Sequence, residues 1–350
     1  MKKKIHMLAG MLALSLLTLT GCGSGAQNAS ANIFVICKST DPYWDTVKAG
    51  ALDAGEEMGL RVHYQAPESE SEVGMQVQMI GEAIDAGADA IVVAPLDTDA
   101  LNSVLGRAKA EGIPVLTIDS DVSYEGRRSC ISTQNYSAGA IAARYVTNLS
   151  LGEGTAAIIT HGNTSQTAQE RTSGFLDELS GKDTLLGGAA PQTAVDAIPG
   201  SGKSNGSGGM SGLRVLESKN GEGNVQQSRE AATQLIKENP DLKLIYTTNQ
   251  PGTLGACQAI EELGKGDEVT LVGFDYFDGA EVYVEEGVLD AIVAQNPYNM
   301  GYLGVRYARK LLRGEAVAKN VDTGVTLITA ENVNDDDIRF LADPTGSKGK

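Results

Sequence analysis

The sequence predicts an α/β protein with two doubly wound parallel-sheet lobes joined by three hinge crossings. From residue 32 onward, short apolar runs rich in β-forming residues alternate with segments of helical spacing, and this series starts twice along the chain. Such alternation is typical of βαβ units, whose parallel sheet is buried on both faces. The length of 350 residues is enough for about two domains with cores of their own.

The first series predicts strands over 32–38, 61–65, 89–94, 114–118 and 129–133. Amphipathic segments at 43–58, 71–86 and 98–110 separate the first four, and a further helix is expected near 136–150. The second series predicts strands over 155–160, 213–217, 242–247, 269–274 and 290–294, with helices near 166–180, 225–238, 253–264 and 277–286.

The chain should cross between the two series near 133–136, 295–298 and 322–326. We therefore expect an N-terminal lobe of residues 32–133 plus 296–324 and a C-terminal lobe of residues 134–295 plus 325–340, followed by a tail over 341–350. Residues 186–212 are rich in Gly and Ser and have no periodicity, so a disordered surface insertion is expected there. A phosphate-loop-like run, 200–204, lies in it, but Ala197 replaces the first Gly of that pattern and no strand leads into the run.

The first residues predict export. Three Lys precede an apolar run of 13 residues from Met7 to Leu19, which is too short to span a bilayer and fits a signal peptide over 1–21. The tetrad that ends in Cys22 resembles the bacterial lipobox, which implies a lipid on Cys22 and a tether over 22–31. The protein would then be lipid-anchored to the outer face of the cytoplasmic membrane, or periplasmic. The alternative is an ordinary signal peptide with an incidental Cys.

Composition excludes several classes of function. A net charge of −17 excludes a nucleic-acid-binding surface spread over the chain. The three remaining cysteines have no metal-ligand or disulfide spacing and are expected to be buried free thiols: Cys37, Cys130 and Cys257. The three His are scattered (His6, His63 and His161), so no metal site, cofactor or catalytic triad is expected.

Polar and aromatic side chains follow the predicted strands, where ligands bind in open α/β sheets. Tyr43 and Trp44 follow the first strand and suggest a flat apolar wall, although one of them could instead cap the core. The polar set comprises Asp119, Thr133, Asn249, Asp275 and Gln295 at strand ends, with Arg171 from a helix. Planar carboxylate, amide and guanidinium groups pair with the adjacent hydroxyls of a sugar or polyol. Each polar residue alone could be a helix cap or turn former.

The chain resembles the type I periplasmic binding proteins of sugar ABC transporters, in the ribose-binding-like branch, over residues 32 to about 330. The resemblance rests on Ser39 to Trp44, Asp89 to Pro95, Pro114 to Asp119, Gln169 to Phe175, and Asn249, Gly273 to Asp275 and Ala294-Gln295. It implies two lobes that close on one monosaccharide and then dock on a permease with its ATPase. It also implies a set of sugar-contacting residues: Asp41, Tyr43, Trp44, Asp119, Thr133, Arg171, Asn249, Phe274, Asp275 and Gln295.

Three departures from the ribose binders put ribose itself in doubt. Ser120 stands where they carry an Arg, Ala94 stands where they carry an Asn, and no aromatic can be aligned between Lys219 and Asn224. We therefore expect a monomeric sugar- or polyol-binding lipoprotein that is not an enzyme. The alternatives are a receptor subunit that presents its closed form to a sensor kinase or chemoreceptor, and a DNA-binding repressor, whose helix-turn-helix would have to occupy the space of the export signal. A glycosidase with Asp119 and Asp275 as its acid and base is a further alternative.

Overall fold

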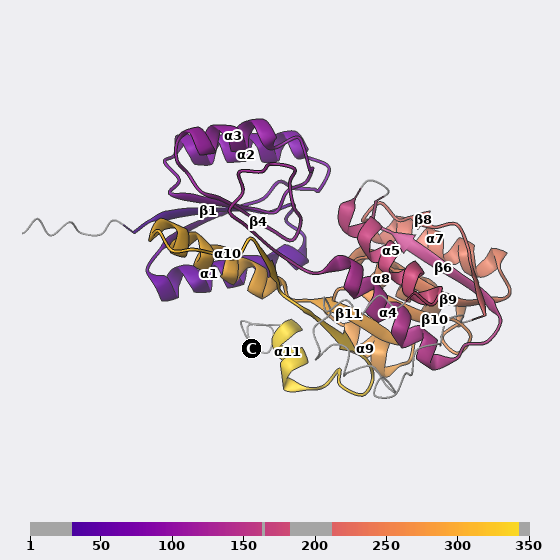
Figure 1. Ribbon diagram of the computed structural model, residues 1–350. Coiled ribbons are helices and arrows are strands. Elements are labelled where there is room, and N and C mark those ends of the chain that lie inside the picture. The colour runs from indigo at the N-terminus through magenta and orange to yellow at the C-terminus, as the bar shows by residue number, and fades with distance from the viewer. Residues whose placement is uncertain (1–29, 163–164, 183–211, 343–350) are drawn as a thin grey trace, which may run out of the picture. The chain divides into compact units, whose positions relative to one another are not determined.

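The first sheet has six strands, and every neighbouring pair is parallel (Figure 1). The computed structural model describes residues 30–162, 165–182 and 212–342. The strands of this sheet, in spatial order, are β12 (Asn320–Asp322), β5 (Ser129–Ser132), β4 (Val115–Ile118), β3 (Ala90–Val93), β1 (Asn32–Ile36) and β2 (Arg61–Gln65).

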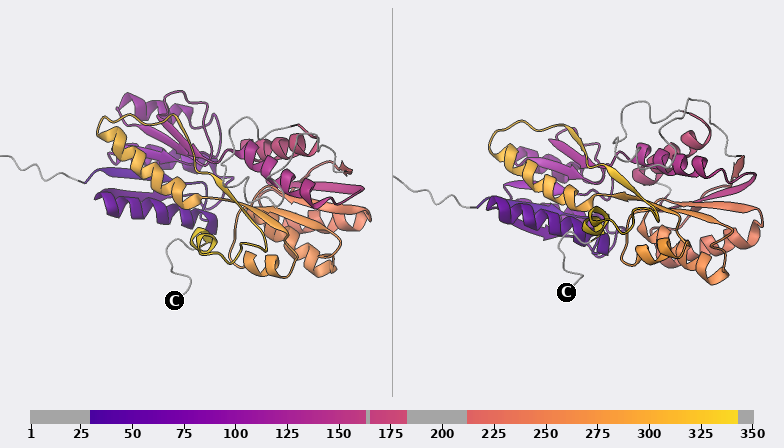
Figure 2. Two further views of the ribbon diagram at one scale, coloured as in Figure 1. Left: turned by 60° about the horizontal axis from the view of Figure 1, so that its bottom comes forward. Right: turned by 90° about the horizontal axis from the view of Figure 1, so that it is seen from below.

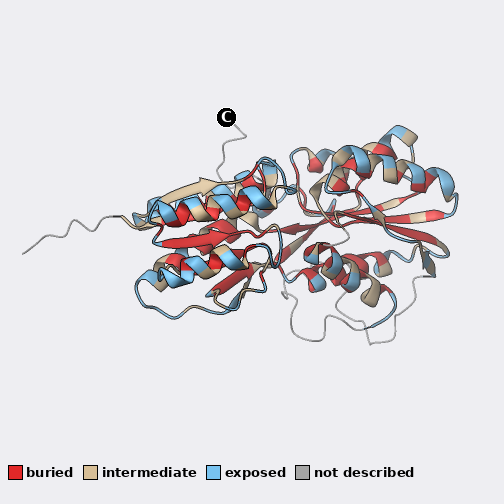
Figure 3. Cartoon of the chain, turned by 90° about the horizontal axis from the view of Figure 1, so that it is seen from above, coloured by how far each residue is buried: buried red, intermediate tan, exposed pale blue. Residues whose placement is uncertain are grey.

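Helices cover both faces of the first sheet because side chains alternate along each strand. Ile33 and Val35 pack with α1 (Pro42–Met58) and α10 (Pro297–Leu312) on one face. Phe34 and Ile36 pack on the other face with α2 (Val73–Asp85) and α3 (Asn102–Ala110). Figure 3 shows the result, with buried strands between helices whose outer sides are exposed. The continuous apolar runs of the sequence are thus strands buried on both faces.

The second sheet has seven strands, and one of its edges is antiparallel. Its spatial order is β13 (Val325–Ile328), β11 (Ala291–Gln295), β10 (Thr270–Phe274), β9 (Leu242–Thr247), β6 (Gly154–Thr160) and β7 (Leu213–Val215), and β8 (Lys219–Asn220) also pairs with β6. One face packs on α4 (Asn135–Leu149) and α5 (Gln166–Leu179). The other face packs on α7 (Val225–Glu238), α8 (Gln250–Leu263), α9 (Ala280–Glu285) and α11 (Asp336–Ala342).

Glycines allow close helix pairs beside both sheets. In the first pair, α1 and α10, a Cβ added at Gly301 would lie 2.0 Å from the carbonyl oxygen of Val47. In the second pair, α4 and α5, a Cβ added at Gly139 would lie 2.0 Å from the carbonyl oxygen of Arg171. Figure 2 shows α10 beside α1 in both views, although the two helices are far apart in the sequence. Only residues without a side chain permit backbones to approach this closely.

The chain passes between the two sheets three times. It leaves the first sheet after β5 and enters α4, returns between β11 and α10, and leaves again between β12 and β13. Residues from Ala31 onward group into one compact unit. The carboxyl ends of strands from both sheets therefore belong to the same unit.

Most predicted strands match the structure within two residues, and those over 61–65 and 242–247 match at both ends. The prediction missed α10, α11 and the short strands β8, β12 and β13. The predicted fold class of two parallel-sheet lobes is confirmed, and β13 is the exception in the second sheet because it runs antiparallel to β11. The prediction placed the start of the tail at residue 341, whereas α11 continues to Ala342.

Cys37, Cys130 and Cys257 are buried free thiols, which confirms that prediction. The signal peptide, Cys22 and residues 186–211 of the predicted insertion lie outside the described residues. Within the described part of the chain, no helix is long and apolar enough to cross a membrane.

Candidate functional site

Asp119 and Asp275 occupy equivalent places in the two sheets. Each follows a strand, β4 or β10, and each has a left-handed backbone, with φ of 62° for Asp119 and 68° for Asp275. The Asp119 N–H donates to the carbonyl of Ile131 at 3.0 Å, and the Asp275 N–H donates to the carbonyl of Val293 at 3.0 Å. Asp is one of the few residues that tolerate this conformation, so both carboxylates stand on fixed backbone turns.

Asp119 is ion-paired. The Nζ of Lys38, just after β1, lies 2.6 Å from Asp119 Oδ2, and the hydroxyl of Ser120 donates to the same oxygen at 2.9 Å. Burial would raise the pKa of the Asp119 carboxyl, but the charge of Lys38 outweighs it, so this pKa is lowered. Asp119 is therefore ionised at neutral pH. The prediction assigned Lys38 no role, because a Lys at a strand end is usually solvated.

Asp275 is buried and only loosely paired. Its Oδ1 accepts a hydrogen bond from Gln295 Nε2 at 2.7 Å, while Arg171 Nη1 stays 4.0 Å from its Oδ2. Burial raises the pKa of Asp275, and the opposing charge of Arg171 does not offset it. The 4.0 Å separation leaves the carboxylate able to accept from another donor.

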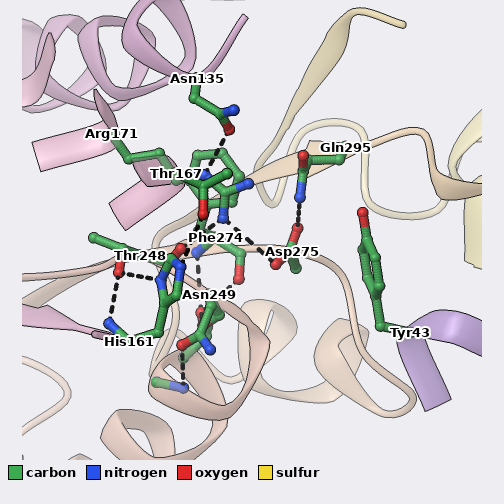
Figure 4. A network of polar contacts seen from close by, with 12 residues as sticks. Tyr43, Asn135, His161, Thr167, Arg171, Thr248, Asn249, Phe274, Asp275 and Gln295 are labelled. Carbon is green, nitrogen blue, oxygen red and sulfur yellow. Dashed lines mark hydrogen bonds and ion pairs between the residues drawn. The ribbon is translucent and has the colours of Figure 1, made fainter. Parts of the chain in front are cut away.

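The guanidinium of Arg171 is fixed by three contacts (Figure 4). Its Nε donates to Asn135 Oδ1 at 2.9 Å, and its Nη1 donates to the carbonyl of Thr248 at 2.7 Å. Its centre lies 3.8 Å from the centroid of the Phe274 ring, which is a cation–π contact. Arg171, only 3% exposed, is held rigidly at the end of the second sheet.

Tyr43 and Trp44 have different environments at the start of α1. Trp44 is 3% exposed and packs in the core of the first sheet, as the alternative interpretation of this pair expected. Tyr43 is half-buried and meets Trp44 edge-on, with ring centroids 5.1 Å apart. Burial raises the pKa of the Tyr43 phenol, and the charges of Asp119 and Asp275 raise it further. Tyr43 thus lies within the field of carboxylates from both sheets, and Figure 4 shows its ring facing Asp275.

Three other predicted site residues lie outside the contacts of Asp119, Asp275 and Arg171 described above. Asp41 is exposed and accepts from the hydroxyl of Ser39 at 2.7 Å. The Asn249 side chain caps α8 by accepting from the Gly252 N–H at 3.0 Å, as expected of a helix cap. Thr133 is buried, and its hydroxyl has no hydrogen-bond partner among the described residues.

A cavity of about 330 Å³ adjoins this site beside the crossing from β5 to α4. Thr133 and Asp119 line it together with Asn135 and Thr167, and Glu170 lies at its wall. Its lining mixes hydroxyl, amide and carboxylate groups, so a polar ligand fits it better than an apolar one.

His161 and Thr248 form a supporting cluster that the sequence did not reveal. The His161 Nδ1 lies 2.8 Å from the Thr248 hydroxyl, and its Nε2 lies 3.0 Å from the hydroxyls of Thr167 and Ser165. Burial and the charge of Arg171 lower the pKa of His161 to about 3, so the imidazole is neutral. Both ring nitrogens are used in hydrogen bonds, which indicates that His161 holds Thr248 and the end of β9 in place.

This arrangement provides hydrogen-bond acceptors, donors and an aromatic surface at the carboxyl ends of the strands. Within the described residues, no group of three or more His, Cys, Asp or Glu is placed to hold a metal ion. Asp119 and Asp275 accept hydrogen bonds, Arg171 and Gln295 donate them, and Tyr43 supplies a ring face. The chemistry that these groups offer is the binding of a polar, hydroxyl-bearing molecule.

Comparison with known protein families identifies the class. The family model described as a periplasmic binding protein domain matches residues 32–316. The chain belongs to this family. Membership implies a location outside the cytoplasm, and the α/β architecture with two parallel-dominated sheets is the type I periplasmic binding protein fold.

Relatives and solved structures of the family are transport proteins, not enzymes. The ribose import binding protein of Bacillus subtilis is 26% identical over 342 residues, covering 94% of this chain and 99% of the relative. A carbohydrate transporter solute-binding protein of Agrobacterium radiobacter, solved with D-arabinose, has a TM-score of 0.77 and 30% identity, covering 90% and 99% of the two chains. A solute-binding protein of Agrobacterium vitis, solved with D-fucose, has a TM-score of 0.75 and 28% identity, covering 89% and 100%.

Proposed function

We propose that this protein captures a monosaccharide or similar polyol between two lobes, one built on each sheet, and delivers it to the permease of an ABC importer. The observation that carries the proposal is the meeting of buried polar groups at strand ends of both sheets. Asp119 comes from the first sheet and Asp275 from the second, and the charges of both act on the Tyr43 phenol. Relatives named for ribose import and solved structures with D-arabinose and D-fucose support a sugar as the ligand.

The proposed ligand-binding residues are five of the ten that the sequence predicted. We assign direct hydrogen bonds with sugar hydroxyls to Asp119, Asp275, Arg171 and Gln295, and stacking on the ring face to Tyr43. Two buried aromatic residues support these contacts: Trp44 packs against Tyr43, and Phe274 packs against the guanidinium of Arg171. A buried polar group left without a partner costs about 1–3 kcal/mol, so an epimer that leaves one of these groups unpaired would be rejected.

A ligand that contacts groups on both sheets stabilises the closed arrangement of the lobes. A ligand shifts a conformational equilibrium only by its difference in affinity for the two states. Since Asp119 and Asp275 belong to different sheets, a sugar that bonds both would favour closure, and a permease could recognise the closed form.

The test is a thermal-shift screen of the purified protein against D-ribose, D-arabinose, D-fucose, other pentoses and hexoses, polyols and nucleosides. Ligand at 1,000 times its dissociation constant stabilises the folded state by about 4 kcal/mol, which is a clear shift in melting temperature. We expect a shift with at least one neutral sugar. Silence across all neutral sugars and polyols, together with a response to a charged or aromatic compound, would remove the proposal.

Matched variants link the shift to the site. Asp275→Asn keeps the size of a side chain that is 6% exposed, and we expect it to abolish the sugar-induced shift while the ligand-free protein stays folded. Asp267→Asn, at an exposed position between α8 and β10, makes the same chemical change away from the site and should leave the shift intact. Equal shifts in both variants would contradict the assignment of Asp275.

We further propose that a lipid on Cys22 anchors the protein to the membrane. The lipobox-like tetrad that ends there suggests a lipid anchor that keeps the protein near its permease. We expect the wild-type protein to fractionate with membranes. The Cys22→Ser variant should either be released from membranes or keep its signal peptide uncleaved. A wild-type protein found free of membranes would favour an ordinary signal peptide.

A further inference from the structure

Lys38 is a largely buried cation just after β1. Its side chain is 12% exposed, and its Nζ contacts both Asp119 Oδ2 and the Ser120 hydroxyl at 2.6 Å. The same ammonium lies 5.8 Å from the centroid of the Trp44 ring. A Lys head group normally stays in water, so its withdrawal to the end of β4, across β3, requires an electrostatic partner.

The two oxygens of the Asp119 carboxylate have different surroundings. Oδ2 receives Lys38 and Ser120, whereas Oδ1 accepts a hydrogen bond from no residue that the structure describes. The backbone of Asp119 is fixed as well, through its left-handed φ and the bond from its N–H to Ile131. The carboxylate therefore has little freedom to turn, and Oδ1 is the oxygen that remains available to a ligand.

The charge balance keeps this arrangement ionised. Burial acts to lower the pKa of Lys38, but the carboxylates of Asp119 and Glu70 outweigh it and raise this pKa. The pKa of Asp119 is lowered in turn. Without Lys38, the same burial would favour a protonated Asp119, which would donate a hydrogen bond where the ionised form accepts one.

We propose that Lys38 is a positioning residue for ligand recognition: it holds Asp119 ionised, with Oδ2 occupied, so that Oδ1 accepts a hydrogen bond from one sugar hydroxyl. The inference rests on the proposed function and deepens it. Lys38 acts through Asp119 and does not itself need to touch the sugar. The site should accordingly require a hydroxyl donor at this point of the ligand.

The experiment measures dissociation constants by titration calorimetry on the purified full-length protein. The probe is whichever of D-ribose, D-arabinose and D-fucose gives the largest wild-type thermal shift or, failing a shift from these three, the neutral sugar of the screen that does. We expect Lys38→Met to weaken binding at least tenfold and Lys38→Arg to stay within about threefold of wild type, since Arg keeps the charge. Lys48→Met is the matched control, because Lys48 is an exposed residue of α1, and this variant should bind as wild type does.

A double-mutant cycle separates positioning from a general structural role. If Lys38 acts through Asp119, the losses from Lys38→Met and Asp119→Asn overlap, and the double variant binds about as weakly as Asp119→Asn alone. Additive losses, or a Lys38→Met variant that binds within threefold of wild type, would overturn the inference. If Lys38→Met does not fold, as judged by circular dichroism, Lys38→Gln takes its place in the cycle. A wild-type protein that responds to no neutral sugar would instead remove the proposed function itself.

Discussion

Replacement of Gly139 by Ala tests whether the close packing of α4 on α5 positions Arg171. The added Cβ would lie 2.0 Å from the Arg171 carbonyl oxygen, and ordinary contact begins at 3.4 Å, so the two helices must separate by about 1.4 Å. Overpacking of this kind costs about 1–3 kcal/mol. The better helix propensity of Ala recovers about 1 kcal/mol of this.

Gly106→Ala provides the matched control. Gly106 is also inside a helix, α3, but a Cβ added there meets nothing within 4 Å. The Gly106→Ala variant should therefore gain about 0.5–1 kcal/mol in free energy of unfolding from helix propensity, with no packing penalty. Because both variants make the same substitution in a helix, the difference between them isolates the packing cost of about 1–3 kcal/mol.

The assay is urea denaturation, which gives the free energy of unfolding of each variant and of the wild type. We expect Gly139→Ala to be less stable than Gly106→Ala by about 1–3 kcal/mol. We also expect Gly139→Ala alone to weaken sugar binding, since the displaced carbonyl belongs to Arg171. If the two variants unfold at the same denaturant concentration, the close approach of α4 and α5 does not control stability and this reasoning is refuted.

Three further predictions concern an Asp that is partly buried, a buried Thr and the buried cysteines. Burial raises the pKa of Asp290 from 3.8 to about 6, so its contribution to stability falls as pH rises from 4 to 6. Asp290→Asn should remove this fall. The unfolding free energy of the variant minus that of the wild type should therefore be about 2 kcal/mol larger at pH 7 than at pH 4, after a discount for partial exposure. The same difference at both pH values would contradict this prediction. Thr253→Val should lower the free energy of unfolding in urea by about 1–3 kcal/mol, because the Thr253 hydroxyl accepts a hydrogen bond from the Phe274 N–H at 2.9 Å. A loss below about 0.5 kcal/mol, which is typical of a surface substitution, would count against this. Burial raises the pKa of the Cys37 thiol to about 12, and Cys130 and Cys257 are buried too, so a thiol reagent should label these residues only in urea; rapid labelling of the native protein would refute their burial.

Most of the fold could be predicted because strands buried on both faces leave unbroken apolar runs. The runs at Asn32–Ile36 and Ala90–Val93, which are apolar and buried apart from Asn32, show this directly. The strand β12, Asn320–Asp322, has one apolar residue in three and becomes a strand only because β5 offers it an unpaired edge. A pairing that comes from tertiary context leaves no pattern in so short a segment.

The sequence predicted the positions of these side chains at strand ends but not all of their partners. Asp119, Asp275 and Gln295 stand at strand ends, which the sequence reveals through the order of apolar runs. Lys38 also stands at a strand end, but its ion pair with Asp119 depends on β1 and β4 lying on either side of β3, which only the sheet order shows. The prediction assigned residues 296–324 to the N-terminal lobe but named no helix there, although Met300, Gly304 and Ala308 follow helical spacing.

The position of α10 and β12 has a consequence for biosynthesis. Both belong to the first sheet and its core, yet they are made after nearly all of the second sheet. A nascent chain that ends before residue 297 therefore has α1 without the helix that covers it and β5 with a bare edge. Its N-terminal portion cannot complete its core during most of translation, which would keep the emerging polypeptide in the loose state that a secretion channel can thread.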